Sequence, residues 1–215
     1  MKKHLLITSV AVTLFTAPTA FAANVGGYIG ASVGGSKFKD APSGSEFDAE
    51  LATAGITATS SVDDTDNAWK IYGGYKFNQN LAVEGSYTDF GELTIDSNVT
   101  APFTGTIDTT WEAQTLAVAG VGILPLAYSM ELFGKIGVHY WDVDLQSTAS
   151  AGGGAGSASE SETGTDLLFG VGAGYNLNNN FALRAEWERY DNLGDDNTTG
   201  ESDVDMWSVG VMYTF

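Results

Sequence analysis

The 215-residue chain carries 27 acidic and nine basic residues, a formal charge of −18, and contains no cysteine. This composition excludes disulfides and cysteine–zinc chemistry, and it argues against nucleic acid as a partner because like charges repel. Helical spans are excluded beyond the first 22 residues, since no later stretch is apolar over the roughly 20 residues that a span needs.

The first 22 residues, "MKKHLLITSVAVTLFTAPTAFA", have the pattern of a secretory signal peptide. Two lysines precede an apolar run, and Ala20-Phe21-Ala22 fits the small-x-small cleavage pattern. We therefore expect export and cleavage after Ala22. The predicted mature part, residues 23–215, has seven basic against 27 acidic residues, a formal charge of −20, and its length suits one domain.

Segments of alternating apolar and polar residues follow one another through the mature part. They are predicted as strands over residues 27–34, 68–77, 81–90, 111–124, 130–141, 167–177, 181–190 and 206–215. Most have about 9 to 11 residues, the length that crosses a bilayer at a tilt. An even number of such strands predicts an all-β fold, an eight-stranded antiparallel up-and-down transmembrane β-barrel.

The connections between these strands alternate in length. Short turns are predicted at residues 78–80, 125–129 and 178–180. Four long acidic loops are predicted at about 35–67, 91–110, 142–166 and 191–205. This asymmetry is typical of outer-membrane barrels, with turns in the periplasm and loops outside the cell. Residues 147–164, rich in Gly, Ala and Ser, are predicted to be mobile.

Aromatic residues stand at both ends of the apolar rows. They are Trp69, Phe77, Phe181, Trp187 and Trp207, and we interpret them as girdles at two lipid–water interfaces. The apolar faces are then lipid-facing and the charged faces line the interior. Because residues 116–123 are apolar on both faces, periodicity does not decide the orientation of the fourth strand, although Leu116 and Val118 are favoured as lipid-facing.

Three segments, "KIYGGYKFNQNLAVEGSYTDFGEL", "LRAEWERYDNLGD" and "DMWSVGVMYTF", resemble the membrane-embedded domain of OmpA-type outer-membrane proteins. The resemblance runs through nearly all of the mature part and implies location in the bacterial outer membrane. It also implies that the barrel-assembly machinery recognises the last strand, with Tyr213 and Phe215 as the signal. Full OmpA-type proteins continue into a peptidoglycan-binding domain that has no counterpart here, so anchoring to the cell wall is not expected.

The resemblance also gives a meaning to the interior charges. In the family a glutamate and an arginine form a salt bridge that closes the pore, and they match Glu84 and Arg184. Lys135 matches an interior basic position, whereas Gly174 replaces a second acid, which weakens the case for gating by exchange of partners. Lys70 and Glu186 are also placed near this network. The charges either lock a packed interior, which we favour, or gate a narrow pore.

No catalytic site and no cofactor are predicted. His139 is the one histidine of the mature part, and no nucleophile motif accompanies it. Its neighbours Asp142 and Asp144 align loosely with it. We expect a histidine that forms hydrogen bonds in the interior or at the rim.

Acidic clusters occur at residues 63–66 and 191–205, and neither has the spacing of a calcium loop. No metal site is therefore predicted. We interpret the clusters as a solvated acidic rim, bridged by divalent cations to lipopolysaccharide phosphates.

These features predict a monomeric outer-membrane barrel protein with a structural role and a narrow, mostly closed pore. The alternative is a surface adhesin or receptor that acts through its acidic loops, since binding often resides in loops on a rigid scaffold. The sequence does not identify a ligand for these loops.

Overall fold

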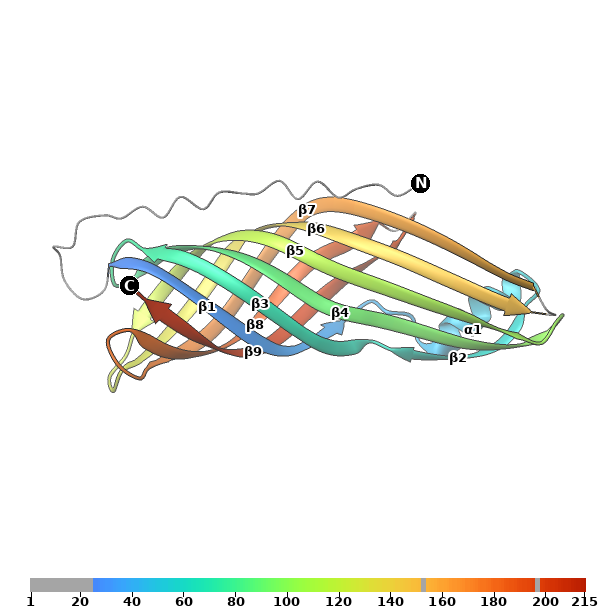
Figure 1. Ribbon diagram of the computed structural model, residues 1–215, viewed down its shortest axis with the longest axis horizontal. Helices are drawn as coiled ribbons and strands as arrows, with labels where there is room; N and C mark the ends of the chain where they lie inside the picture. Colours follow the sequence, from blue (N-terminus) through green and yellow to red (C-terminus); the bar gives the residue numbers. More distant parts are fainter. Residues whose placement is uncertain (1–24, 152–153, 196–197) are drawn as a thin grey trace.

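The computed structural model describes residues 25–151, 154–195 and 198–215, so the predicted signal peptide lies outside the described residues. These ranges form nine strands and one helix, α1 (Gly44–Thr53) (Figure 1). No helix in them is long and apolar enough to cross a membrane. The strands are β1 (Gly26–Phe38), β2 (Thr57–Asp63), β3 (Thr65–Lys76), β4 (Leu81–Ala101), β5 (Gly105–Pro125), β6 (Met130–Ala151), β7 (Gly154–Asn176), β8 (Phe181–Asp195) and β9 (Gly200–Thr214).

Eight of the strands close into a ring. The order β4-β3-β1-β9-β8-β7-β6-β5 is completed by pairing of β5 with β4, and each pairing is antiparallel. The first and last strands join in continuous register from Tyr28↔Thr214 to Phe38↔Val204. Strand β2 directly precedes β3 and pairs with the far part of β4. The predicted eight-stranded antiparallel barrel is confirmed.

Two of the three short turns, at residues 78–80 and 178–180, have the same local chemistry. Asn78 Oδ1 accepts the backbone N–H groups of Asn80 and Leu81 at 2.8 and 3.0 Å. In the turn between β7 and β8, Asn178 Oδ1 accepts those of Asn180 and Phe181, both at 2.9 Å. An asparagine side chain that bonds to the backbone two residues ahead fixes a tight turn.

The strands differ in length. Strands β4 to β7 have 21, 21, 22 and 23 residues, whereas β1, β3, β8 and β9 have 13, 12, 15 and 15. About 9 to 11 residues cross a bilayer, so β4 to β7 are about twice as long as a crossing needs. These four strands continue well past the shorter ones (Figure 1). We call this continuation, with β2, the distal sheet; it comprises β2 and residues 92–101, 105–113, 142–151 and 154–166.

Over the described residues 147–151 and 154–164, the prediction of a mobile, unfolded segment does not hold, because these residues form strand. Strand β6 runs to Ala151 and β7 starts at Gly154, and the two are paired from Ala151↔Gly154 onward. The segments predicted as loops at 91–110 and 142–166 are mostly strand, and the segment at 35–67 contains α1 and β2. Gly, Ala and Ser have weak strand propensity, but pairing with neighbouring strands outweighs that propensity.

Helix α1 lies near β2 in the distal region (Figure 1). It begins with a capping box in which Glu46 N–H bonds to Ser43 Oγ at 3.3 Å and Ser43 N–H bonds to Glu46 Oε2 at 2.8 Å. The hydrogen bond from the Ser43 backbone lowers the pKa of Glu46. Phe47 of this helix packs against the apolar interior of the barrel.

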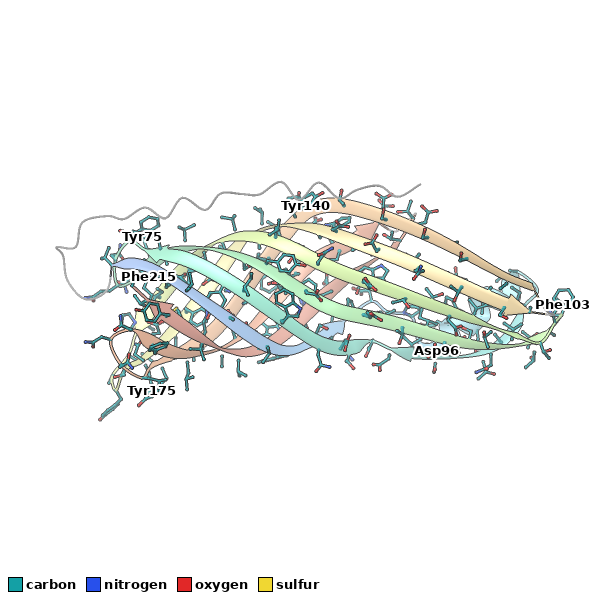
Figure 2. All side chains as sticks on the ribbon, in the orientation of Figure 1. Tyr75, Asp96, Phe103, Tyr140, Tyr175 and Phe215 are labelled. Carbon is teal, nitrogen blue, oxygen red and sulfur yellow. The ribbon has the colours of Figure 1, made fainter. Side chains whose placement is uncertain are left out.

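The outer surface of the barrel is apolar between the short turns and the distal sheet. Leu116 and Val118 are 57% and 58% exposed, so the favoured orientation of the fourth predicted strand is confirmed. Figure 2 shows Tyr75, Tyr175 and Phe215 at the end that holds the short turns and Tyr140 nearer the middle of the molecule. The apolar band lies between these two levels.

The polarity of the two faces inverts where the distal sheet begins. In β6, Val138 and Tyr140 point outward, whereas Asp142 and Asp144 occupy the same outward positions further along. On the inward side Lys135 is followed by Val143, which is fully buried. In its β4, β5 and β6 parts the distal sheet therefore has an apolar interior and a charged exterior, as a water-soluble sheet does, whereas the inward row of β7 is acidic.

Candidate functional site

Six charged side chains meet inside the barrel, and each residue is at most 8% exposed. We call them the lumen network: Lys70 from β3, Glu84 from β4, Lys135 from β6, and Arg184, Glu186 and Glu188 from β8. The alternation of side chains along a strand directs all six inward. Three cations thus meet three carboxylates.

Glu84 lies at one side of the lumen network. Arg184 contacts it through two nitrogens, with Nη1 at 2.6 Å from Oε2 and Nη2 at 3.2 Å from Oε1. Lys135 Nζ donates to Glu84 Oε1 at 2.9 Å, and the hydroxyl of Tyr28 donates to Oε2 at 3.0 Å. Both oxygens of this buried carboxylate are therefore satisfied.

The other two carboxylates, Glu186 and Glu188, lie two positions apart on the inward face of β8. Lys135 Nζ is 2.8 Å from Glu186 Oε2 and 2.8 Å from Glu188 Oε1. Lys70 forms ion pairs with Glu186 and Glu188, and Arg184 Nη2 donates to Glu186 at 3.1 Å. Since an unpaired buried charge is costly, such a network is stable only when its charges balance, as they do here.

The structure thus brings together the five interior residues named from the sequence and adds Glu188. Glu188 shares its inward orientation with Arg184 and Glu186, so its position in the strand carried the signal. The positions matched to the OmpA-type family in the sequence did not include Glu188. Tyr190 continues the same row, and its hydroxyl donates to Glu188 Oε1 at 3.3 Å.

An apolar cluster lies on each side of the lumen network. The cluster toward the short turns contains Tyr28, Tyr72, Ala82, Val121, Ile123, Phe133, Ala182 and Met212. The guanidinium of Arg184 lies over the rings of Phe133 and Tyr72, at 4.1 and 4.7 Å from their centroids. The distal cluster includes Phe38, Phe90, Trp111, Trp141, Tyr190, Leu193, Val204 and Met206.

The end of β8 and the start of β9, as far as the structure describes them, fold across the distal mouth of the barrel. We call residues 191–195 and 198–202 the hairpin tip. Its Leu193 is fully buried, and the indole N–H of Trp111 on β5 donates to the carbonyl of Thr199 at 3.0 Å. Strands β5 and β8 are separated in the ring by β6 and β7, so this bond crosses the mouth.

His139 lies in the distal cluster and is fully buried. Its Nε2 is 3.1 Å from the carbonyl oxygen of Asp191, and its ring meets the ring of Tyr190 edge-on at 5.3 Å. Asp142 and Asp144 project to the outside of β6, so the alignment considered from the sequence does not form. The contacts of His139 are those of a histidine that packs and forms hydrogen bonds.

The aromatic residues named from the sequence lie on the outside of the barrel at two levels. Trp69, Phe77, Phe181 and Trp207 are 42%, 57%, 44% and 67% exposed. They pair with neighbours across strands, as in Trp187–Trp207 at 6.2 Å, Trp69–Tyr87 at 5.3 Å and Phe181–Tyr213 at 5.0 Å between ring centroids. Phe215 stacks edge-on against Tyr213 at 5.4 Å.

Acidic residues form a row on the outside of the distal sheet. Glu92 lies directly opposite Glu112, which lies directly opposite Asp144 on the next strand. Partial burial and the neighbouring carboxylates of Glu92 and Asp144 raise the pKa of Glu112. Within the described residues, no three such groups are arranged to hold a metal ion.

Several acids of the two clusters noted in the sequence have local partners. Asp64 pairs with Lys37 at 3.1 Å, and Asp66 accepts the backbone N–H of Glu92 at 2.9 Å. Asp205 pairs with Arg189 at 2.6 Å. Part of the predicted acidic rim therefore fixes the geometry of the strands.

Comparison with known proteins agrees with this fold. The profile of the family described as "OmpA-like transmembrane domain" matches residues 22–215. Outer membrane protein A of Serratia marcescens is 29% identical over 144 residues, which are 66% of this chain and 37% of that protein. The corresponding protein of Yersinia pseudotuberculosis is 28% identical over 66% of this chain and 38% of its own length. The chain thus spans well under two thirds of these relatives.

Two solved barrels have a similar fold. The attachment invasion locus protein Ail of Yersinia pestis, in complex with the heparin analogue sucrose octasulfate, has a TM-score of 0.51 at 19% identity, covering 89% of this chain and 99% of that one. Neisserial surface protein A has a TM-score of 0.51 at 15% identity over 88% and 97%. The chain belongs to the family of OmpA-like transmembrane domains and is a β-barrel protein of the bacterial outer membrane.

Proposed function

We propose that the protein is a monomeric structural barrel whose lumen does not conduct ions in its resting state, and that it has no catalytic role. The observation that carries this proposal is the balanced lumen network between two apolar clusters. An eight-stranded barrel leaves room for little more than its own side chains. The hairpin tip adds a further cover at the distal mouth.

Single-channel recording in planar bilayers tests this proposal. We expect the wild-type protein to show no sustained openings at neutral pH, because three layers of side chains block the path. Arg184→Met weakens one layer and is expected to leave conductance low, whereas truncation of Phe133 and Trp111 together with Arg184→Met is expected to produce openings. Sustained openings of the wild-type barrel would contradict the closed lumen.

A second function, binding at the cell surface, is favoured by a separate observation. Strands β4 to β7 continue past the membrane as a paired sheet, where short loops would be enough to close a barrel. We propose that this distal sheet lies outside the cell, with the short turns in the periplasm. A rigid sheet is a suitable support for a binding surface because little entropy is lost on association.

The ligand is expected to differ from that of Ail. Ail was solved with a sulfated, anionic heparin analogue. The present chain carries 27 acidic against nine basic residues, and its distal sheet displays the row Glu92, Glu112 and Asp144 on the outside. Such a surface repels polyanions and attracts cationic partners. We also propose that divalent cations join the acidic clusters at residues 63–66 and 191–205 to lipopolysaccharide phosphates.

Deletion of residues 147–164 separates the two functions. If the distal sheet binds a surface ligand, the deletion abolishes adhesion of expressing cells to host or phage surfaces and leaves detergent sensitivity of the envelope unchanged. If the protein is structural only, adhesion is the same with and without the segment. Heat-modifiable migration in detergent gels shows whether the shortened barrel is folded.

Assembly is a further part of the proposal. Phe181, Tyr213 and Phe215 form an outward aromatic stack at the end of β9, and we propose that the barrel-assembly machinery recognises Tyr213 and Phe215. Phe215→Ala is expected to slow insertion, measured as the fraction of heat-modifiable protein after a pulse of synthesis. Leu177→Ala, at another exposed position near the short turns, is the matched control. Equal insertion of both variants and wild type would contradict this role.

A further inference from the structure

The ring of strands is incomplete along one side of the distal sheet. Strand β7 pairs with β6 over its whole length, from Gly154 to Tyr175. Its pairing with β8 covers only Leu168↔Tyr190 to Asn176↔Ala182. Among the described residues, the β8 side of residues 154–166 therefore has no partner strand. We call this stretch the β7 edge.

The cause is the course of β8 after Tyr190. A register shift separates Tyr190 from Leu193 in the β8–β9 ladder, and Asn192 and Gly194 have φ angles of 50° and 97° in the left-handed region. This bend turns the hairpin tip across the mouth, where Thr199 accepts the bond from Trp111. The strand that continues the ring next to β7 is thus used to cover the mouth, and the β7 edge is left unpaired.

The bonding pattern shows which backbone groups face the gap. Near the turn, Leu177 N–H donates to Phe181 O of β8, whereas Asn176 N–H donates to Ser129 O on the β6 side. Bonding alternates along an antiparallel strand, so odd-numbered residues of β7 bond toward β8. Along the β7 edge the N–H and C=O groups of Ser157, Ser159, Ser161 and Thr163 therefore point into the gap.

The β7 edge lacks the usual protection against pairing. Residues 154–166 contain no proline and no lysine, and no bulge interrupts their pairing with β6. The outward side chains are small hydroxyls, which do not obstruct an added strand. The inward row of the same stretch carries Glu160, Glu162 and Asp166.

The charge at the β7 edge selects the partner. No lysine or arginine occurs in the sequence between Lys135 and Arg184, so β7 and the distal part of β6 carry acids alone. A second copy paired antiparallel about Ser161 would place Glu160 of one copy opposite Glu162 of the other, and like charges directly opposite are destabilising. A strand with basic side chains on its inward face instead finds carboxylates along its length.

We propose that the β7 edge binds an extended, basic segment of a partner protein by β-strand addition. Main-chain hydrogen bonds to the odd-numbered residues supply the affinity, and Glu160 and Glu162 select lysine or arginine at alternate positions. This inference rests on the proposed function of surface binding and names its site and the chemical class of its ligand.

Binding of synthetic peptides to the full mature protein in lipid nanodiscs tests the proposal. The probe is a ten-residue peptide of alternating lysine and threonine; one control alternates glutamate and threonine, and another alternates lysine and proline, which has the same charge but few N–H groups. We expect binding of the first peptide alone, with affinity that falls as salt rises. Equal binding of the lysine–proline peptide would reduce the interaction to charge attraction and overturn strand addition.

Hydrogen exchange resolved by residue locates the bound strand. In the free protein the amides of Ser159, Ser161 and Thr163 should exchange fast and those of Glu160 and Glu162 slowly. The lysine–threonine peptide should protect the odd-numbered amides. Binding without protection along the β7 edge, or a concentration-dependent dimer that protects the same amides without peptide, would overturn the assignment.

Two variants complete the test. Ser161→Pro removes an N–H from the gap without touching the bonds to β6 and should weaken peptide binding by about tenfold or more, whereas Ser161→Ala should bind normally. The double variant Glu160→Gln with Glu162→Gln leaves the backbone unchanged and should reduce both affinity and its salt dependence. Heat-modifiable migration confirms folding of each variant, and unchanged affinity in the folded variants would reject the site.

Adhesion assays distinguish failure of this inference from failure of the proposed function. If deletion of residues 147–164 abolishes adhesion but Ser161→Pro does not, surface binding stands and the β7 edge is not the site. If neither change affects adhesion, the proposed surface function is wrong, and peptide binding alone decides whether the edge accepts a strand.

Discussion

Strand β6 contains two halves with opposite polarity. Between Leu132 and Tyr140 its apolar side chains face outward and its charged Lys135 faces inward, whereas beyond Trp141 the acids face outward and Val143 faces inward. The backbone is continuous and pairs with the same neighbours throughout. The surrounding medium, lipid in one half and water in the other, therefore decides which face is apolar, and the inversion at Tyr140 and Trp141 marks the membrane surface.

The largest expected effect is in the lumen of the membrane half. Arg184→Met leaves three carboxylates with two cations and should destabilise the barrel by about 3–5 kcal/mol, measured as the unfolding midpoint in urea with detergent. Adding Glu84→Gln restores the balance, since Lys70 and Lys135 still face Glu186 and Glu188. The double variant should recover much of the loss.

Arg184→Lys keeps the positive charge but cannot form the two-nitrogen contact with Glu84. This control therefore separates the effect of losing the charge from the effect of losing that contact. Additive losses in the cycle of Glu84→Gln and Arg184→Met would show that the two residues are not coupled. Such a result would show that the ion pairs of the lumen network do not stabilise the membrane half.

A smaller effect is expected when one cationic residue is placed on the outside of each half of β6. Ile136→Arg puts a charge on the lipid face, where the side chain is 68% exposed, and should cost about 2–4 kcal/mol near the bilayer midplane. Gln146→Arg makes the same addition on the distal sheet and should change stability by less than about 0.5 kcal/mol. Equal costs at the two positions, measured by unfolding from lipid vesicles, would contradict the membrane boundary at Tyr140.

The smallest expected effect concerns the acidic row of the distal sheet. Partial burial, together with the like charges opposite Glu112, raises its pKa, so its ionised form costs stability at neutral pH, and that cost disappears as the pH falls through the raised pKa. Glu112→Gln should therefore stabilise the distal sheet by a few tenths of a kcal/mol at pH 7, after screening by solvent.

Hydrogen exchange in the distal sheet measures this effect at pH 7 and below pH 4. The difference between Glu112→Gln and wild type should be present at the higher pH and absent at the lower one. High salt at pH 7 should reduce it as well. A difference that persists at low pH would assign the change to packing and not to repulsion.

The membrane half was largely predictable from the sequence because its rule is simple. Apolar side chains at every second position, with aromatics at the ends, gave the number of strands and the outward faces, including Leu116 and Val118. The distal half was not, since residues 147–164 contain too few apolar side chains to show any alternation. Their strand structure comes from pairing with neighbours that are distant in the sequence.

The interior was predictable in part. Glu84 and Arg184 were identified by resemblance and Lys70 and Glu186 by position, while Glu188 needed only the inward row of β8. The course of the hairpin tip was not predictable, because its bond from Trp111 joins residues 88 positions apart. No local pattern encodes a contact of that kind.

The place of Lys70 in the ring has a consequence for the order of assembly. Lys70 lies on β3 and its partner Glu186 on β8, 116 positions away in the sequence, and these strands meet only through the pairing of β1 with β9. Before that seam closes, Lys70 has neither of its carboxylate partners in reach and must remain hydrated, whereas Arg184 and Glu186 already share β8. We therefore expect water to leave the surroundings of Lys70 only when this seam closes, so that a chain with an open seam differs from a finished barrel by the water it still holds.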